Sequence, residues 1–171
     1  MKEVERTFLA RHLPDLGNCK SKEIIDIYIP KSDVHPKMRI RKNGNKFIIT
    51  KKVPLKDNDT SVFEEQNIFL TEEEFAALAA LDGKRVRKIR YEYFHKGKKA
   101  EIDVFQGSLS GLVLVDFEFD SEEEKNAFEM PDFCLAEVTQ EEFIAGGMLC
   151  GKSFEDIKDK LEKFGYRGVV K

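Results

Sequence analysis

The feature that most constrains this chain is a regular alternation of charged and apolar residues in eight separate segments. Successive side chains of a β-strand point to opposite faces, so alternation with a period of two is typical of half-buried strands. The sequence therefore predicts eight strands, with polar turns between several of them. They occupy residues 2–9, 25–30, 37–42, 46–53, 61–70, 84–94, 99–106 and 112–119.

Short turn sequences between the segments favour antiparallel hairpins. Asn43-Gly44-Asn45 and Lys96-Gly97-Lys98 are typical of such turns, because Gly and Asn tolerate the positive φ that tight turns require. Helices are expected to be few, short and peripheral. Candidate N-caps are Thr71, Ser121, Thr139 and Ser153, and an acidic residue follows each of them three positions later.

Seven of the eight segments have one face rich in charge. Such a face is compatible with an open sheet that exposes one side to water. Alternation alone favours that open sheet, but it is also compatible with a closed barrel of about eight strands, whose interior holds side chains or one small ligand. In a barrel the charged faces would point inward and the amphipathic helices would cover the outside.

Acidic and basic residues of these faces lie on different strands. The acids are on strands near the two ends of the series, and the bases are on the middle strands. The acids are Glu3, Glu5, Asp103, Asp116 and Glu118, and the bases are Arg39, Arg41, Lys52, Lys88 and Arg90. Carboxylates are preferred ligands of Mg²⁺ and Mn²⁺, whereas Arg and Lys neutralise phosphate oxygens. Opposed groups of this kind suit a polyanion that is bridged to hard metal ions.

Composition excludes several other classes of protein. Charged residues make up 36% of the chain, but the net charge is only −3, so the basic surplus of a nucleic-acid-binding protein is absent. Three widely spaced cysteines, Cys19, Cys134 and Cys150, suit a reducing compartment. The charged N-terminus is unlike a signal peptide, and no apolar run approaches the ~20 residues of a membrane helix. We therefore expect a cytoplasmic protein with neither nucleic-acid nor membrane partners.

The order of the charged segments resembles the CYTH, or triphosphate tunnel metalloenzyme, superfamily, which includes thiamine triphosphatases, inorganic triphosphatases and class IV adenylyl cyclases. Glu3-Val4-Glu5 is similar to the start of the family's E-x-E-x-K strand, and Glu101-Ile102-Asp103 to its E-x-D-x-F strand. Further matches follow in the family's order, over about residues 3–139. They are Arg39-Ile40-Arg41, Thr50-Lys51-Lys52, Glu65, Lys88-Ile89-Arg90, 111–118 and Glu137-Val138-Thr139.

The resemblance implies a mainly β (α+β) fold: an eight-stranded antiparallel closed β-barrel with a charged interior and peripheral helices, formed by a single domain over residues 1–171. It also implies hydrolysis of inorganic triphosphate or an organic triphosphate with Mg²⁺ or Mn²⁺.

The implied substrate-binding residues are Arg39, Arg41, Lys52, Lys88, Arg90 and Lys152. The implied metal ligands are Glu3, Glu5, Asp116 and Glu118. Glu65 and Asp103 are implied to assist a second metal ion or the attacking water. The expected partner is a small-molecule triphosphate or nucleoside triphosphate, and the expected oligomeric state is a monomer or homodimer.

Two residues depart from the family pattern. Thr7 replaces the lysine of E-x-E-x-K, and Asp116 replaces the first Glu of a late pair of acids. Asp keeps the charge of Glu with a shorter reach, whereas Thr removes a cation that contacts the phosphates in the family. Two other functions therefore stay open: an adenylyl cyclase, and a nonenzymatic triphosphate or nucleotide sensor with reduced turnover.

A second motif competes with this interpretation. Residues 146–153 fit the P-loop pattern G-x-x-x-x-G-K-[ST]. Only 18 residues follow Ser153, too few to build the parallel sheet of a P-loop protein. We interpret the segment as a tight glycine turn before the last helix, from which Lys152 could reach one mouth of the tunnel.

Overall fold

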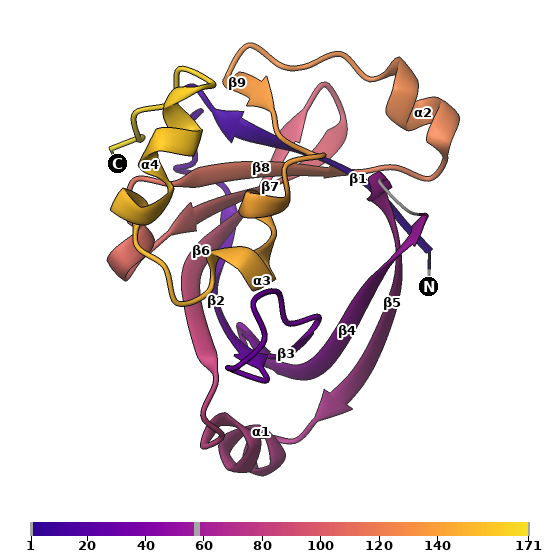
Figure 1. Ribbon diagram of the computed structural model, residues 1–171. Helices are drawn as coiled ribbons and strands as arrows, with labels where there is room; N and C mark the ends of the chain where they lie inside the picture. Colours follow the sequence, from indigo (N-terminus) through magenta and orange to yellow (C-terminus); the bar gives the residue numbers. More distant parts are fainter. Residues whose placement is uncertain (1, 57–58, 171) are drawn as a thin grey trace.

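The computed structural model describes residues 2–56 and 59–170 (Figure 1). Nine strands form one sheet. They are β1 (Lys2–Ala10), β2 (Lys20–Ile29), β3 (Met38–Asn43), β4 (Lys46–Lys56), β5 (Asp59–Leu70), β6 (Lys84–His95), β7 (Lys98–Phe105), β8 (Val113–Glu118) and β9 (Cys134–Glu137). The helical elements are α1 (Glu72–Ala79), η1 (Gly107–Leu109), α2 (Glu122–Ala127), η2 (Glu142–Ile144), α3 (Gly146–Leu149) and α4 (Phe154–Glu162).

The sheet closes on itself. Its order is β5-β4-β3-β2-β6-β7-β8-β1, and an additional antiparallel pairing joins β1 to β5. Figure 1 shows the strands as a ring, with β9 outside it. The predicted eight-stranded antiparallel closed barrel is therefore confirmed, and the open sheet is wrong. Closure removes the unpaired edges that an open sheet would expose.

Strand β1 changes partner along one of its edges. Its first residues, Lys2–Val4, pair with β5, and its last residues, from Phe8 to Ala10, pair with β9. Strand β9 was not predicted, because its four residues are too few to display an alternating pattern. Without the ladder to β9, the second half of this edge would have no strand beside it.

The helix caps follow the predicted chemistry at three of the four positions. Thr71 and Ser153 form capping boxes with Glu74 and Asp156, and the Ser121 side chain also caps its helix. The predicted start at Thr139 is wrong. Its hydroxyl donates to the Glu137 carboxylate instead, and only a short 3-10 turn follows, at Glu142–Ile144.

Two apolar clusters leave the barrel interior to polar side chains. One lies on the outer face of β1 and β6–β8 and includes Phe8, Ile102 and Phe117. The other joins one end of the barrel to η2, α3 and α4, where Leu149 and Leu161 are fully buried. In Figure 1 α3 lies over the opening of the ring. No helix in the described residues is long and apolar enough to span a bilayer.

Candidate active site in the barrel

A cavity of about 790 Å³ occupies the barrel interior. Eleven of the twelve residues implied by the sequence line this cavity, and they come from seven strands. They are Glu3, Glu5, Arg39, Arg41, Lys52, Glu65, Lys88, Arg90, Asp103, Asp116 and Glu118. The alternation of the strands explains this arrangement, because residues two apart point to the same face.

Lys152 is not among the residues that line the cavity. It lies between α3 and α4, where its backbone carbonyl accepts a hydrogen bond from Ser108 at 2.9 Å. The glycine-rich segment does not follow a strand, as a P-loop must, but follows the 3-10 turn η2. Gly146 and Gly147 nevertheless line the cavity, since they lie where α3 meets its mouth.

Arg41 is held by a carboxylate that the sequence did not single out. Its Nε and one terminal nitrogen donate to the two oxygens of Asp26, at 2.6 and 2.7 Å. Asp26 is only 2% exposed. Burial opposes ionisation of this carboxyl, but the Arg41 guanidinium outweighs that effect and lowers the pKa of Asp26 to about 2. The pair therefore fixes one edge of the Arg41 guanidinium and leaves its remaining nitrogen for a ligand.

Arg39 is much less constrained. One terminal nitrogen lies 3.4 Å from the Tyr28 hydroxyl, and its buried Nε has no hydrogen-bond partner. A buried donor without an acceptor costs free energy, and native structures contain few of them. The position of Arg39 thus indicates that an acceptor, such as a phosphate oxygen, completes this part of the cavity.

Two further cations share one carboxylate. Asp103, fully buried on β7, accepts hydrogen bonds from Lys88 and, at 2.7 Å to each of its oxygens, from Arg90. Burial disfavours its charged form, but Arg90 and Lys88 outweigh this and hold the pKa of Asp103 far below its usual value. Burial also lowers the pKa of Lys88, against the charge of Asp103. Asp103 therefore orients both cations.

Lys52 bridges to the acids of the first strand. Its ammonium lies 2.8 Å from Glu3 and 3.0 Å from Glu5. The predicted separation into opposed acidic and basic groups is therefore wrong, because acids and bases are in direct contact. Closing the barrel brings the strands together, and Arg41, Lys52, Lys88 and Arg90 each take a nearby carboxylate because an unpaired buried charge is costly.

The carboxylates of β1 and β8 crowd one another. Glu5 is directly opposite Glu118, and Thr7 is opposite Asp116. Burial, followed by the charges of Asp103 and Glu5, raises the pKa of Asp116 to about 7. Burial and neighbouring acids also raise the pKa of Glu3 and of Glu118. The positive charge near Glu3, Asp116 and Glu118 is therefore too small to offset burial and the repulsion between these carboxylates.

A divalent cation would relieve this crowding, and oxygen donors are what Mg²⁺ and Mn²⁺ prefer. In their present rotamers, no three His, Cys, Asp or Glu side chains of the described chain form a ready-made metal cage. The donor set therefore fits a hard metal ion chemically, and binding requires the side chains to turn away from Lys52 and Thr7.

Thr7 faces the cavity, as its position on the strand predicts. Its hydroxyl donates to Asp116 at 2.7 Å, and its backbone N–H donates to the Thr139 hydroxyl at 3.0 Å. The side chain thus adds a neutral donor, not a cation, beside the crowded acids.

Several lining residues were missed by sequence reasoning. Asp26 and Tyr28 lie on β2, directly opposite Arg41 and Arg39. Apolar neighbours on both sides masked the alternation of this strand, although the two-residue spacing of Asp26 and Tyr28 was a usable signal. Thr50, Asn67 and Glu101 also line the cavity, as expected from the two-residue spacing that they share with Lys52, Glu65 and Asp103.

Comparisons with known proteins agree with this geometry. No protein-family model matches the chain. An inorganic triphosphatase from Nitrosomonas europaea is 34% identical over 143 residues, which cover 82% of this chain and 91% of that protein. A crystal structure of an inorganic triphosphatase superposes with a TM-score of 0.64 at 31% identity, covering 86% of this chain and 93% of the other.

A more distant structure shares the fold alone. A suggested adenylate cyclase from Bacillus halodurans matches with a TM-score of 0.54 at 18% identity, over 99% of this chain and 94% of the other. The barrel is therefore common to proteins with different assignments, and the activity must be argued from the cavity.

Proposed function

This chain belongs to the triphosphate tunnel metalloenzyme family of the CYTH superfamily, and we propose that it hydrolyses the terminal phosphoanhydride bond of inorganic triphosphate inside its barrel. Family membership rests on the similarity to the Nitrosomonas europaea inorganic triphosphatase over most of both chains. The observation that supports the substrate is Arg39, which lines the cavity and has a buried Nε without an acceptor.

The cations of the cavity hold the phosphate chain in this proposal. They are Arg39, Arg41, Lys52, Lys88 and Arg90. Phosphoryl transfer depends mainly on positioning and on stabilising charge, and such an array supplies both. Asp26 keeps Arg41 in place, and Asp103 does the same for Lys88 and Arg90. The substrate then competes with these carboxylates for donors that are already oriented.

Glu3, Glu5, Asp116 and Glu118 would hold the divalent ion, for which we propose Mg²⁺ or Mn²⁺. When bound, the ion supplies positive charge to the phosphate oxygens and polarises the bond that breaks. The raised pKa of Asp116 means that this carboxyl must lose its proton before it serves as a ligand.

Glu65 is the better placed of the two residues implied to act on water. Burial opposes its ionisation, but the hydrogen bond from Asn67 and the charge of Lys52 lower its pKa, so it is ionised at neutral pH. We assign to Glu65 the orientation of the attacking water. Both oxygens of Asp103 are taken by Lys88 and Arg90, so we assign to Asp103 the positioning of these cations and not proton transfer.

A parallel assay tests the proposed function. Purified protein with Mg²⁺ or Mn²⁺ should release orthophosphate from inorganic triphosphate, lose this activity when the metal is chelated, and form no cyclic AMP from ATP. Triphosphate should also raise the melting temperature, since ligand at about 100 times its Kd adds ~2.7 kcal/mol of stability.

Two lysine variants control for charge in that assay. Lys88→Met should abolish hydrolysis, because Lys88 lies in the cavity, whereas Lys163→Met, on the exposed end of α4, should not. Absence of both hydrolysis and any melting shift would refute the proposal. Cyclic AMP formation would replace it with the cyclase.

Thr7→Lys should tighten binding of a nonhydrolysable triphosphate. A new ammonium near Asp116 and the phosphates gains about 4 kcal/mol at ~4 Å with an effective dielectric near 20. Desolvation and lost rotamer freedom remove much of this, so we expect an affinity gain of roughly tenfold. Calorimetry measures the affinity, and steady-state kinetics measures separately whether turnover also rises.

Thr7→Ser serves as the matched control, because it keeps the hydroxyl that donates to Asp116. If the lysine tightens binding and raises turnover, the missing cation limits the natural chain. Tighter binding with turnover still at background would identify a triphosphate sensor. Weaker binding would show that another group already fills the position of the family's lysine.

A further inference from the structure

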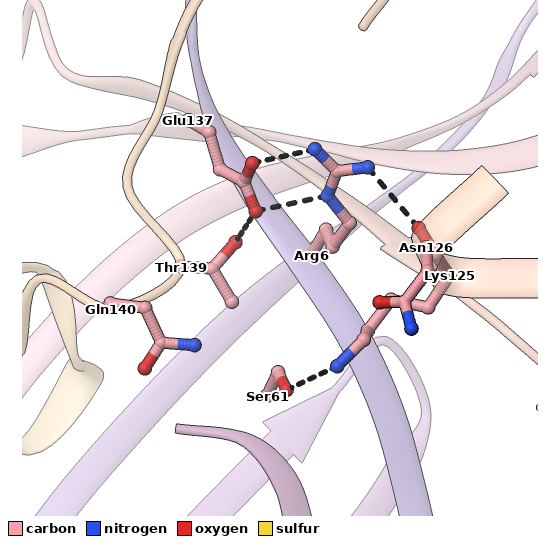
Figure 2. A pocket seen from close by; sticks show the side chains of 7 residues that line it. All are labelled: Arg6, Ser61, Lys125, Asn126, Glu137, Thr139 and Gln140. Atoms are coloured by element: carbon pink, nitrogen blue, oxygen red, sulfur yellow. Dashed lines mark hydrogen bonds and ion pairs between the residues drawn. The ribbon is translucent and has the colours of Figure 1, made fainter. Parts of the chain in front are cut away.

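A second cavity, of about 290 Å³, lies beside the tunnel (Figure 2). Its walls come from β1, β5, α2, the end of β9, and Thr139 and Gln140, which follow β9 in the chain. The lining residues are Arg6, Ser61, Lys125, Asn126, Glu137, Thr139 and Gln140. Thr139 and Gln140 also line the tunnel, so the two cavities adjoin at this segment.

The wall between the cavities lies at the change of partner on β1. Pairing with β5 ends at Val4 and pairing with β9 begins at Phe8. Between them, the Thr7 N–H donates to the Thr139 hydroxyl, a side chain, instead of to a strand carbonyl. The Thr7 carbonyl accepts a hydrogen bond from the Val138 N–H at 2.8 Å, so a single backbone hydrogen bond and the Thr139 side chain, and not a continuous ladder, separate the tunnel from the second cavity.

The second cavity is lined by two basic residues, Arg6 and Lys125, and one acidic residue, Glu137. Arg6 donates to both oxygens of Glu137, at 2.9 and 2.5 Å, and to the backbone carbonyls of Lys125 and Phe128. The Thr139 hydroxyl adds a third hydrogen bond to Glu137, at 2.7 Å. Figure 2 shows Arg6, Glu137 and Thr139 joined in one cluster. The charges of Arg6 and Glu137 therefore cancel within the cluster.

Lys125 supplies the excess positive charge. Its ammonium donates to the Ser61 hydroxyl at 2.8 Å and forms no ion pair with any carboxylate in the described part of the chain. An ammonium has three N–H donors, so two remain for a ligand. Asn126, next to it on α2, adds an amide to the same wall.

We propose that this cavity is a subsite for a small tetrahedral oxyanion at a side window of the tunnel, and that orthophosphate released by hydrolysis binds there to Lys125 and Asn126. The identification of the oxyanion as the reaction product rests on the proposed function. The chemistry of the site does not, because an ammonium that forms no ion pair within the described residues, beside a paired Arg6 and Glu137 and a neutral amide, suits any such anion.

The test is a calorimetric titration of the full chain with orthophosphate, with the tunnel filled by Mg²⁺ and a nonhydrolysable imido analogue of triphosphate. Wild type should bind orthophosphate under these conditions. Lys125→Met should weaken that binding by about tenfold or more, the value of one charged hydrogen bond. Lys125→Arg, which keeps the charge, and Lys163→Met, which removes an exposed lysine elsewhere, should bind as wild type does.

Equal affinities of Lys125→Met and wild type, or no orthophosphate binding once the tunnel is filled, would overturn the subsite. Melting curves establish that the Lys125→Met variant is folded. Anomalous diffraction from crystals soaked in selenate gives a direct location: a peak at the Lys125 ammonium supports the subsite, and peaks confined to the tunnel refute it. Lys125-dependent binding in a chain without triphosphatase activity would refute the proposed function and leave the oxyanion subsite standing.

Discussion

Replacing Arg41 with methionine should lower the free energy of unfolding by about 3 kcal/mol, the lower end of the ~3–5 kcal/mol typical of breaking a buried ion pair. The loss follows from leaving Asp26, which is 2% exposed, without the two hydrogen bonds that hold it ionised. Nearby charges on Arg39 and Lys88 compensate in part, which favours the lower end. Urea denaturation at neutral pH measures the effect.

The double variant Asp26→Leu/Arg41→Met separates stability from binding. Replacing both members of a buried pair by apolar groups is often neutral, so most of the lost stability should return. Triphosphate binding should stay weaker by ~1.5–3 kcal/mol, since the cation is absent in both variants. If the double variant is as unstable as Arg41→Met alone, the uncompensated charge of Asp26 is not the cause of the loss.

The pH dependence gives an independent check on this pair. The pKa of Asp26 is lowered in the folded state, so the pair stabilises the fold above the pKa of the unfolded carboxyl, 3.8. That stabilisation is lost as the pH falls from about 4 through about 2. Stability curves of wild type should therefore fall more steeply in this window than those of the double variant.

Much of the fold followed from one local property, the period of the alternation. Strands with a charged residue at every second position place those side chains on one face and the apolar side chains on the other. The short turns between strands predicted that neighbouring strands are antiparallel. Closure could not be derived from periodicity, because it depends on the contact of Val4 with Val62 from distant strands. The resemblance to a known family was needed to choose the barrel.

The site was predicted where charge and period agree, and missed where they conflict. Arg39, Arg41, Lys88 and Arg90 stand in clear alternation, and all four line the cavity. Asp26 is surrounded by isoleucines, so its strand reads as a buried apolar run. The pairing of each cation with a particular carboxylate depends on the register between strands, and the alternation within a single strand does not specify that register.

Arg39→Met should reduce kcat/KM for inorganic triphosphate by about 10²–10³, the usual effect of removing one donor that stabilises charge in a transition state. Its effect on folding should be smaller than that at Arg41. Arg39 has one long hydrogen bond, to Tyr28, and a buried Nε without an acceptor, and its charge is also attracted by Asp26 and Glu65, so its removal takes away a desolvated group with weaker contacts than the paired Arg41. We expect the free energy of unfolding of the variant to change by no more than about 1 kcal/mol.

Steady-state kinetics and urea denaturation, performed on the same preparations, decide this prediction. Arg87→Met is the matched control, because Arg87 is an exposed arginine that pairs with Glu23 on the outer face of the barrel, and it should leave kcat/KM unchanged. Loss of stability in Arg39→Met as large as that in Arg41→Met would mean that both arginines are structural cations. A loss of activity without a comparable loss of stability assigns the Arg39 guanidinium to the substrate, because its contacts would then matter more for catalysis than for folding.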